Sequence, residues 1–395
     1  MILPFNFTKI PNIIFGAGKL NQLFEIIPKF GKNILFVIGE NSLKNSGKWA
    51  EIESGLERTS LQYSLITVPK EPSPPLIDDS AQKFRNKNID LVISIGGGSV
   101  TDAGKAISAM ITKTGSIKNY LEGVGNKIHD GKKIPFIAIP TTSGTGSEAT
   151  KNAVISEIGP NGFKKSLRHD NLIPNATIID PELMISCPPS VSAACGMDAF
   201  TQLVESFVSL KGNPITDSLA ISGIKYISEN LLKACSTGAS DVKVRTAMAY
   251  GSLISGITLA NAGLGIIHGL ASPIGGFFDI PHGIVCGTLL SEASKMNIKN
   301  LQKIGVSGKD ALQKYAQVGA LLMDRQIVKT DNIEDYCSKL TNTLDDWTDQ
   351  LRLDRLGKYG ITNDDVDKIV NKAGLKNNPV NLNSEDISTI IINRL

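Results

Sequence analysis

Three side chains in the second half of the chain could bind a metal ion. The chain has only four histidines, and two of them, His268 and His282, lie in or just after a long uncharged segment. Asp198 lies in an otherwise apolar helical pattern, where a buried carboxylate needs a cation or several hydrogen-bond donors. Two imidazoles and one carboxylate suit Fe(II) or Zn(II), with positions open for substrate. The spacing alone does not exclude the alternative that both histidines are hydrogen-bonded core residues.

Two glycine-rich turns follow short apolar runs in the first half. Gly96–Ser99 leads into a helical pattern, so its bare backbone N–H groups suit a pyrophosphate at the positive end of a helix. It departs from the G-x-G-x-x-G fingerprint, because Thr101 stands at the last glycine position. Gly144–Ala149 fits G-x-G-x-x-A and lies among hydroxyl side chains, which is a weak signal on its own. Together the turns favour a nucleotide site over plain strand-to-helix turns.

Glu40 lies directly after another apolar run and its terminal glycine. A carboxylate at this position could bind a ribose diol and repel a 2′-phosphate. This favours NAD over NADP, with a solvated loop acid as the alternative interpretation.

The order of apolar runs predicts the elements that must position these groups. Strands are expected at 33–38, 61–68, 90–95, 135–139 and 176–179, with helical stretches such as 78–87 and 101–112 between them. This alternation is typical of βαβ units around a mainly parallel sheet, where ligands bind at the ends of strands. After Cys187–Ser190 the pattern is helical almost throughout, including 198–210, 215–232, 242–259 and 311–323. We expect an α/β domain over 1–185 and an all-α domain over 186–395.

Composition excludes several classes of protein. The chain has 395 residues with 20% charged and 41% hydrophobic residues, which excludes a disordered chain. The formal net charge is only +3 and the lysines are scattered, so no nucleic-acid-binding face is expected. The five cysteines share no regular spacing, which indicates reduced thiols and a cytoplasmic protein.

Neither the N-terminal residues nor the long uncharged segment predicts a membrane protein. The first residues lack the basic start, apolar run and small-residue cleavage site of a signal peptide. The segment Ala247–Phe278 has no Asp, Glu, Lys or Arg and is long enough to span a bilayer. Its many Gly, Ser, Asn and Pro residues favour a buried helix pair instead.

Motifs along essentially the whole chain resemble the iron-containing (group III) alcohol dehydrogenase family. They are PNIIFGAGKL, IGGGSVTDAGKA, AIPTTSGTGSEAT, IIDPEL, GMDAFTQ, GLGIIHGLASPIGGFFDIPHG and NNPVNLNSEDI. The resemblance implies an α/β dinucleotide-binding domain and an all-helical domain, an architecture shared with dehydroquinate synthase, with the site in the cleft between them. It implies that Asp198, His268 and His282 bind the metal, Fe(II) or alternatively Zn(II). The implied cofactor contacts, for NAD or possibly NADP, are Gly97, Gly98, Ser99, Asp102, Thr141, Thr142, Thr145, Thr150, Val154, Lys164 and Leu183.

The chain departs from the family pattern at two positions. Gln202, one helical turn after Asp198, stands where the family usually has a histidine ligand. Either Gln202 ligates weakly, or the site works with three protein ligands and water, as in the zinc-using glycerol dehydrogenases. Ser272 stands where many relatives have another histidine near the substrate, and it is a candidate proton relay.

The resemblance implies reversible hydride transfer between a small primary alcohol and nicotinamide, with the metal as Lewis acid, in a homodimer paired through the N-terminal segment. The first alternative is a dehydroquinate-synthase-like lyase that uses NAD transiently. Such an enzyme needs clustered Lys, Arg and His for a phosphorylated acid, and the second half lacks that density. The second alternative, motivated by Gln202, is an inactive, metal-poor homologue with a binding role.

Overall fold

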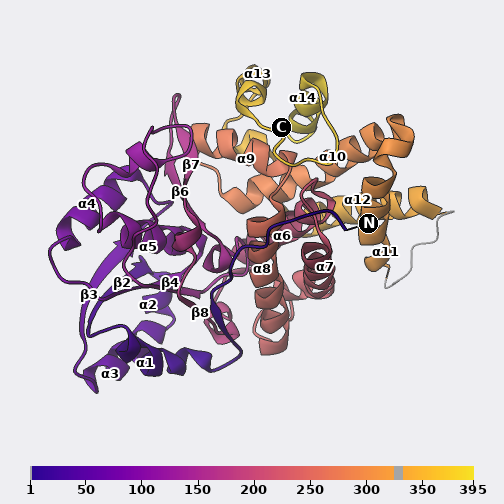
Figure 1. Cartoon of the computed structure of the whole chain (residues 1–395). Helices are drawn as coiled ribbons and strands as arrows, with labels where there is room; N and C mark the ends of the chain where they lie inside the picture. The colour runs from indigo at the N-terminus through magenta and orange to yellow at the C-terminus, as the bar shows by residue number, and fades with distance from the viewer. Residues whose placement is uncertain (1, 324–331) are drawn as a thin grey trace.

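The computed structural model describes residues 2–323 and 332–395. An α/β part formed by the first half of the chain lies beside a helical part formed by the second half (Figure 1). The predicted fold class is confirmed. The predicted boundary at residue 185 falls between a short helical turn at Pro181–Met184 and helix α6 (Pro189–Val208), and the division into two domains stays a prediction.

A six-stranded parallel sheet forms the centre of the α/β part. Its strands are β1 (Asn12–Phe15), β2 (Asn33–Gly39), β3 (Gln62–Val68), β4 (Leu91–Gly96), β5 (Phe136–Pro140) and β8 (Ala176–Ile179), in the order β1-β8-β5-β4-β2-β3. The five predicted strands are present. The pattern missed β1, a four-residue edge strand that pairs with β8 from the other end of this half.

Both faces of the sheet are covered by helices, as a parallel sheet requires. Helices α4 (Pro74–Phe84) and α5 (Gly98–Met110) pack on one face. Helices α1 (Leu23–Ile26) and α3 (Lys48–Glu57) pack on the other, and α2 (Ser42–Asn45) follows the end of β2. Strand β4 is buried along its whole length, so the glycine turn after it starts from a rigid base.

Helix α6 is the central element of the helical part and is buried almost continuously from Ser192 to Val208. The helices around it are α7 (Pro214–Ala234), α8 (Val242–Ala262), α9 (Ile266–Phe277), α10 (His282–Lys303), α11 (Lys309–Leu321), α12 (Ile333–Gln350), α13 (Asn363–Lys372) and α14 (Ser384–Ile392). Among the described residues, no single helix is long and apolar enough to cross a membrane. Helices α8 and α9 meet that condition only together, and they are bent by 100° against each other.

A two-stranded hairpin, β6 (Asn152–Glu157) and β7 (Phe163–Arg168), connects the two parts. The hydroxyl of Ser272 in α9 donates to the backbone oxygen of Lys164 in β7 at 2.7 Å. The backbone N–H of Gly159, in the hairpin turn, donates to the oxygen of Gly276 at 3.1 Å. The hairpin therefore holds α9 against the α/β part, beside the cleft.

The loop after β5 touches α8 so closely that only glycines fit. A Cβ on Gly256 would lie 2.1 Å from the backbone oxygen of Gly146, which itself has φ +59°. This contact brings the hydroxyl-rich loop of the α/β part onto the helical part, where the two halves of the cleft meet.

Candidate functional site

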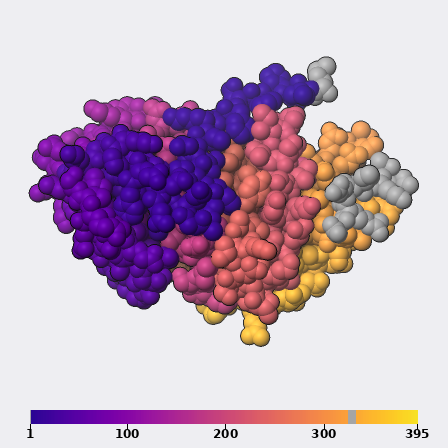
Figure 2. All heavy atoms as spheres, turned by 90° about the horizontal axis from the view of Figure 1, so that it is seen from below, coloured from indigo at the N-terminus to yellow at the C-terminus, as the bar shows by residue number. Residues whose placement is uncertain are grey.

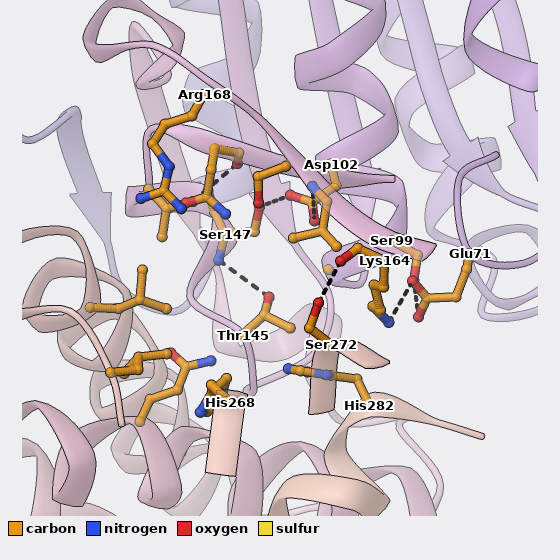
Figure 3. Close-up of a pocket in the computed structure, with 18 of the residues that line it drawn as sticks. Glu71, Ser99, Asp102, Thr145, Ser147, Lys164, Arg168, His268, Ser272 and His282 are labelled. Carbon is orange, nitrogen blue, oxygen red and sulfur yellow. Dashed lines mark hydrogen bonds and ion pairs between the residues drawn. The ribbon is translucent and has the colours of Figure 1, made fainter. Parts of the chain in front are cut away.

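A cavity opens where the two parts of the molecule meet (Figure 3). Its α/β wall is formed by the start of α5, the loop after β5 and the hairpin strands. Its helical wall carries His268 and His282, whose rings point into the cavity from α9 and α10. The residues on its lining are Glu71, Gly98, Ser99, Asp102, Thr145, Ser147, Thr150, Asn152, Val154, Lys164, Ser166, Arg168, Gln202, Leu259, Leu264, His268, Ser272, His282 and Lys376.

The glycine turn after β4 presents the N-terminus of α5 to the cleft. Gly97 is the N-cap residue in an extended conformation, and Gly98 is the first residue of the helix. A Cβ on Gly98 would lie 2.7 Å from Thr145 Oγ1. The two polar turns can therefore approach each other this closely only with glycine at position 98. Unpaired N–H groups and the helix dipole at this position suit a phosphate group.

A buried lysine fixes the loop after β5. Lys105 is fully buried, and its Nζ lies 2.8 Å from the backbone oxygens of Ser147 and Asn152 and 3.0 Å from that of Thr150. Asp102, one turn earlier on α5, accepts hydrogen bonds from the Ser147 hydroxyl and, at 3.1 Å, from the Val154 N–H. Burial raises the pKa of Asp102 and lowers that of Lys105 to about 8. This pair fixes the loop that carries the predicted cofactor contacts.

An ion pair lines the wall of the cleft near the start of α5. Lys164 Nζ lies 3.1 Å from a carboxylate oxygen of Glu71, and the Ser99 hydroxyl donates to the same carboxylate at 3.3 Å (Figure 3). Burial raises the pKa of Glu71, but the facing Lys164 outweighs it and leaves the pKa below its ordinary value. The sequence analysis did not identify Glu71, because no pattern in the loop after β3 indicates an ion pair with Lys164, which lies 93 positions later in the chain.

The three predicted metal ligands converge on one point. Asp198 Oδ1 lies 3.4 Å from Nε2 of His268 and 3.7 Å from Nε2 of His282. Asp198 is 1% exposed, and Oδ1 has no hydrogen-bond partner among the described residues. A buried carboxylate oxygen that faces two imidazole nitrogens without a hydrogen bond is the arrangement that a bound cation completes.

The environment of the cluster also keeps its acid ionised. Burial by itself raises the pKa of Asp198, but the facing His282 and His268 outweigh it and hold the pKa at about 2. Burial lowers the pKa of His282 to about 4, so this imidazole is neutral near pH 7 and has a lone pair to offer.

Glu205, which the sequence analysis did not single out, orients His268. Its carboxylate lies 2.6 Å from Nδ1 of His268 and accepts the N–H of Ile267 at 2.7 Å. With Nδ1 as the hydrogen-bonded donor, Nε2 is the ring nitrogen that faces Asp198 and is left for an ion. Glu205 is seven residues after Asp198 on α6, so helical spacing places both side chains on the same face. That spacing could have identified Glu205 from the sequence.

A fourth potential ligand atom lies beside the histidines. Cys286 Sγ is 3.6 Å from Nε2 of His268 and 3.6 Å from Nε2 of His282. One ligand atom from each of Asp198, His268, His282 and Cys286 lies within 4.8 Å of the others. Gln202 also borders the cavity, but its Oε1 accepts a hydrogen bond from Ser255 at 3.1 Å, and its Nε2 is 3.5 Å from Asp198 Oδ2.

Most of the other predicted residues border the same cavity. They are Gly98, Ser99, Asp102, Thr145, Thr150, Val154, Lys164 and Ser272. Gly97 and Thr142 lie next to this group, since a Cβ on Gly97 would be 3.3 Å from Thr142 Oγ1. Thr141 follows β5, and Leu183 is 6% exposed in the core beneath the sheet. Glu40 is exposed at the end of β2, which pairs with β4 and so ends beside the glycine turn.

Comparisons with known proteins agree over the whole chain. A family model described as iron-containing alcohol dehydrogenase matches residues 11–181, and one described as the C-terminal part of the Fe-containing alcohol dehydrogenase family matches residues 192–395. Long-chain-alcohol dehydrogenase 1 of Geobacillus thermodenitrificans is 39% identical over 270 residues, 68% of this chain and 67% of that protein.

Two more relatives extend this agreement. The NAD-dependent methanol dehydrogenase of Bacillus methanolicus is 29% identical over 85% of this chain and 94% of its own. The structure of an archaeal alcohol dehydrogenase from a Red Sea brine pool superimposes with a TM-score of 0.89 at 27% identity, over 100% of this chain and 99% of that chain.

Proposed function

This chain belongs to the iron-containing alcohol dehydrogenase family, and on that premise we propose how its cleft carries out the reaction. The chain is a metal-dependent, NAD(P)-linked alcohol dehydrogenase, which interconverts an alcohol and an aldehyde by hydride transfer to or from nicotinamide. We propose that the alcohol or aldehyde is small.

We propose that Asp198, His268 and His282 hold the divalent ion. The observation that carries this proposal is the buried Asp198 oxygen, unpartnered among the described residues and facing two imidazole nitrogens. The donor set fits either Fe(II) or Zn(II). When bound, such an ion supplies a Lewis acid that lowers the pKa of the alcohol and stabilises the alkoxide.

The chain's own residues keep this site ready for the ion and substrate. Glu205 holds the proton of His268 on Nδ1 and so leaves Nε2 free. The apolar side chains of Leu259 and Leu264 border the cavity and restrict water around the reacting carbon.

We propose that the dinucleotide lies across the ends of β2 and β4, with its pyrophosphate at Gly97 and Gly98. Glu40 at the end of β2 then meets the adenosine ribose, which favours NAD over NADP. The loop around Thr145, fixed by Lys105, would direct the nicotinamide toward the metal ligands. We propose that the other contacts to the dinucleotide come from Ser99, Asp102, Thr141, Thr142, Thr150, Val154, Lys164 and Leu183.

Ser272 is proposed as a relay for the alcohol proton. Its hydroxyl now donates to the Lys164 backbone oxygen at 2.7 Å, so in a relay its oxygen would accept the alcohol proton while its own proton passes to solvent in the cavity that it borders. We also propose a cytoplasmic enzyme, since all five cysteines are free thiols.

A homodimer paired through the N-terminal segment completes the proposal. This segment runs along the surface of the helical part with Ile2 and Leu3 exposed by 70% and 75% (Figure 2). Exposed apolar side chains in an extended segment are typical of a surface that a second chain covers.

A panel of small alcohols and aldehydes tests the function. Purified protein stripped of metal is reconstituted with Fe(II) or Zn(II), and NADH absorbance is followed. We expect alcohol-dependent NADH formation that disappears in His268→Ala, while NAD binding survives, and that persists in His129→Ala, which removes a comparably buried histidine elsewhere. Activity retained in His268→Ala would disprove the ligand assignment. Product formation without net NADH would support the lyase alternative, and no tightly held metal with no turnover would support the inactive homologue.

A further inference from the structure

The metal cluster contains one ligand atom beyond the three residues of this chain that match the family pattern. Cys286 is fully buried and lies one turn after His282 on α10, so both side chains project from the same face of that helix. Its Sγ faces the two histidine Nε2 atoms at 3.6 Å each. The thiol therefore lies among two imidazoles and a carboxylate, a polar environment that favours a ligand role over simple core packing.

The distances between these atoms match the edges of a zinc tetrahedron. With Zn–S of about 2.3 Å and Zn–N and Zn–O of about 2.0 Å, tetrahedral angles give S···N edges of about 3.5 Å and N···O edges of about 3.3 Å. The observed S···N separations are 3.6 and 3.6 Å, and the observed N···O separations are 3.4 and 3.7 Å. Four of the six edges between the ligand atoms therefore lie within about 0.4 Å of those around one tetrahedral zinc ion, and all four atoms lie within 4.8 Å of one another.

Gln202 is oriented for a different task. Its carbonyl oxygen, the only atom of the amide that could ligate, accepts a hydrogen bond from Ser255 at 3.1 Å. Its Nε2 faces Asp198 Oδ2, 3.5 Å away, which is the carboxylate oxygen opposite the cluster. The reversed amide would place an oxygen against a carboxylate oxygen and is disfavoured. Gln202 therefore orients Asp198 rather than replacing the missing histidine.

We propose that Cys286 is the fourth protein ligand of the metal, in place of the residue at position 202, and that this chain is built for Zn(II). The inference rests on the proposed metal site. A thiolate is a soft ligand that favours Zn(II) over Fe(II). In the general order of divalent ions, Fe(II) also binds protein ligands more weakly than Zn(II) does. The thiol proton is released to solvent when the ion binds. Asp198, His268, His282 and Cys286 would hold the ion, and the cavity beside them would leave room for the alcohol that the ion polarises.

Cobalt substitution tests this directly. Metal-free protein is loaded with one equivalent of Co(II), and its binding is verified by elemental analysis. We expect the near-ultraviolet charge-transfer absorption of a cobalt–thiolate bond in the wild type and in Gln202→Ala, and its loss in Cys286→Ser. Cys337→Ser is the matched control, because Cys337 is also buried, at 3% exposure, but lies on α12 outside the cluster, and it should keep the band.

Zinc binding supplies two further measurements, and the first of them uses only the wild type. X-ray absorption at the zinc edge of the wild type should require one sulfur scatterer at about 2.3 Å. Chelator competition should show that Cys286→Ser weakens zinc binding by more than about 100-fold, beyond what the loss of an outer partner costs, whereas Gln202→Ala stays within about 10–100-fold.

The outcomes separate this inference from the proposed function. One bound ion without a thiolate band and without a sulfur scatterer would overturn the role of Cys286 and leave the metal site in place. A band that Cys286→Ser retains would also overturn it. Failure of the wild type to bind any ion would overturn both proposals together.

Discussion

Changing Glu205 to glutamine should weaken metal binding without removing any metal ligand. The glutamate accepts two hydrogen bonds, from Ile267 N–H at 2.7 Å and from Nδ1 of His268 at 2.6 Å. An amide has only one acceptor oxygen, so in Glu205→Gln its NH₂ group would face either the Ile267 N–H or Nδ1. If the oxygen keeps the backbone N–H, Nδ1 must become the acceptor and the imidazole proton moves to Nε2, the atom that faces Asp198.

The size of this effect follows from the buried position of the pair. Glu205 is 5% exposed, so a charge-assisted hydrogen bond there contributes about 1.5–3 kcal/mol. That corresponds to a loss of roughly 10–100-fold in metal affinity, the range found for outer partners of metal-binding histidines. The assay is chelator competition on the purified variant, with zinc quantified at equilibrium, and we expect kcat with saturating metal to fall as well.

Glu148→Gln provides the matched control for Glu205→Gln. Glu148 is 4% exposed but does not contact the metal cluster, so its replacement should leave metal affinity unchanged. Equal metal affinity in Glu205→Gln and wild type would refute the reasoning that Glu205 sets the tautomer of His268. Equal losses in both variants would show that burying an amide, rather than reorienting His268, causes the effect.

Three further outcomes are expected. In Gly98→Ala the new Cβ would lie 2.7 Å from Thr145 Oγ1, so NAD binding should weaken by about 1–3 kcal/mol with metal affinity unchanged, as calorimetry would show; unaltered NAD affinity would contradict the proposed pyrophosphate site. In Glu40→Ser, removal of an exposed charge worth about 1 kcal/mol should raise the NADP to NAD preference in kcat/KM roughly fivefold, and an unchanged ratio would place the ribose elsewhere. Burial raises the pKa of Glu148 from 4.5 to about 7, so its contribution to stability is present below pH 4.5 and is lost as the pH rises to 7. Glu148→Gln should therefore gain up to about 3 kcal/mol relative to wild type between pH 5 and pH 8 in denaturant unfolding, and parallel pH profiles would contradict that shift.

The sequence was most informative where a local pattern recurs along the chain. Continuous apolar runs such as 33–38 and 90–95, alternating with helical stretches, are typical of strands buried on both faces of a parallel sheet, and those strands are present. His268 and His282 were recognisable because histidines are scarce in the chain and because the resemblance aligned them with Asp198.

Other features depend on contacts between distant segments. Strand β1 is too short to be seen without its partner β8, and the ion pair of Glu71 and Lys164 joins loops whose approach only the folded chain sets. Lys105 gave no signal either, since a lysine on a helix is usually exposed, whereas here its ammonium group has five oxygen atoms of Ser147, Thr150 and Asn152 within hydrogen-bonding distance.

Cys286 and Glu205 are a different case. Each is related to a recognised ligand by helical spacing, four residues after His282 and seven after Asp198, and that spacing was available in the sequence. Both residues lie outside the positions at which the family pattern has ligands, so the resemblance does not point to them, whereas the faces of helices α6 and α10 do.

The central claim is that one divalent ion lies in the cleft between Asp198, His268 and His282, opposite the nicotinamide. The most direct test is a crystal of the protein with NAD, measured on either side of the zinc and iron absorption edges. We predict a single anomalous peak within bonding distance of all three side chains, with the nicotinamide ring on its open side. Imidazoles turned away from each other, or a peak elsewhere with the dinucleotide in place, would contradict it.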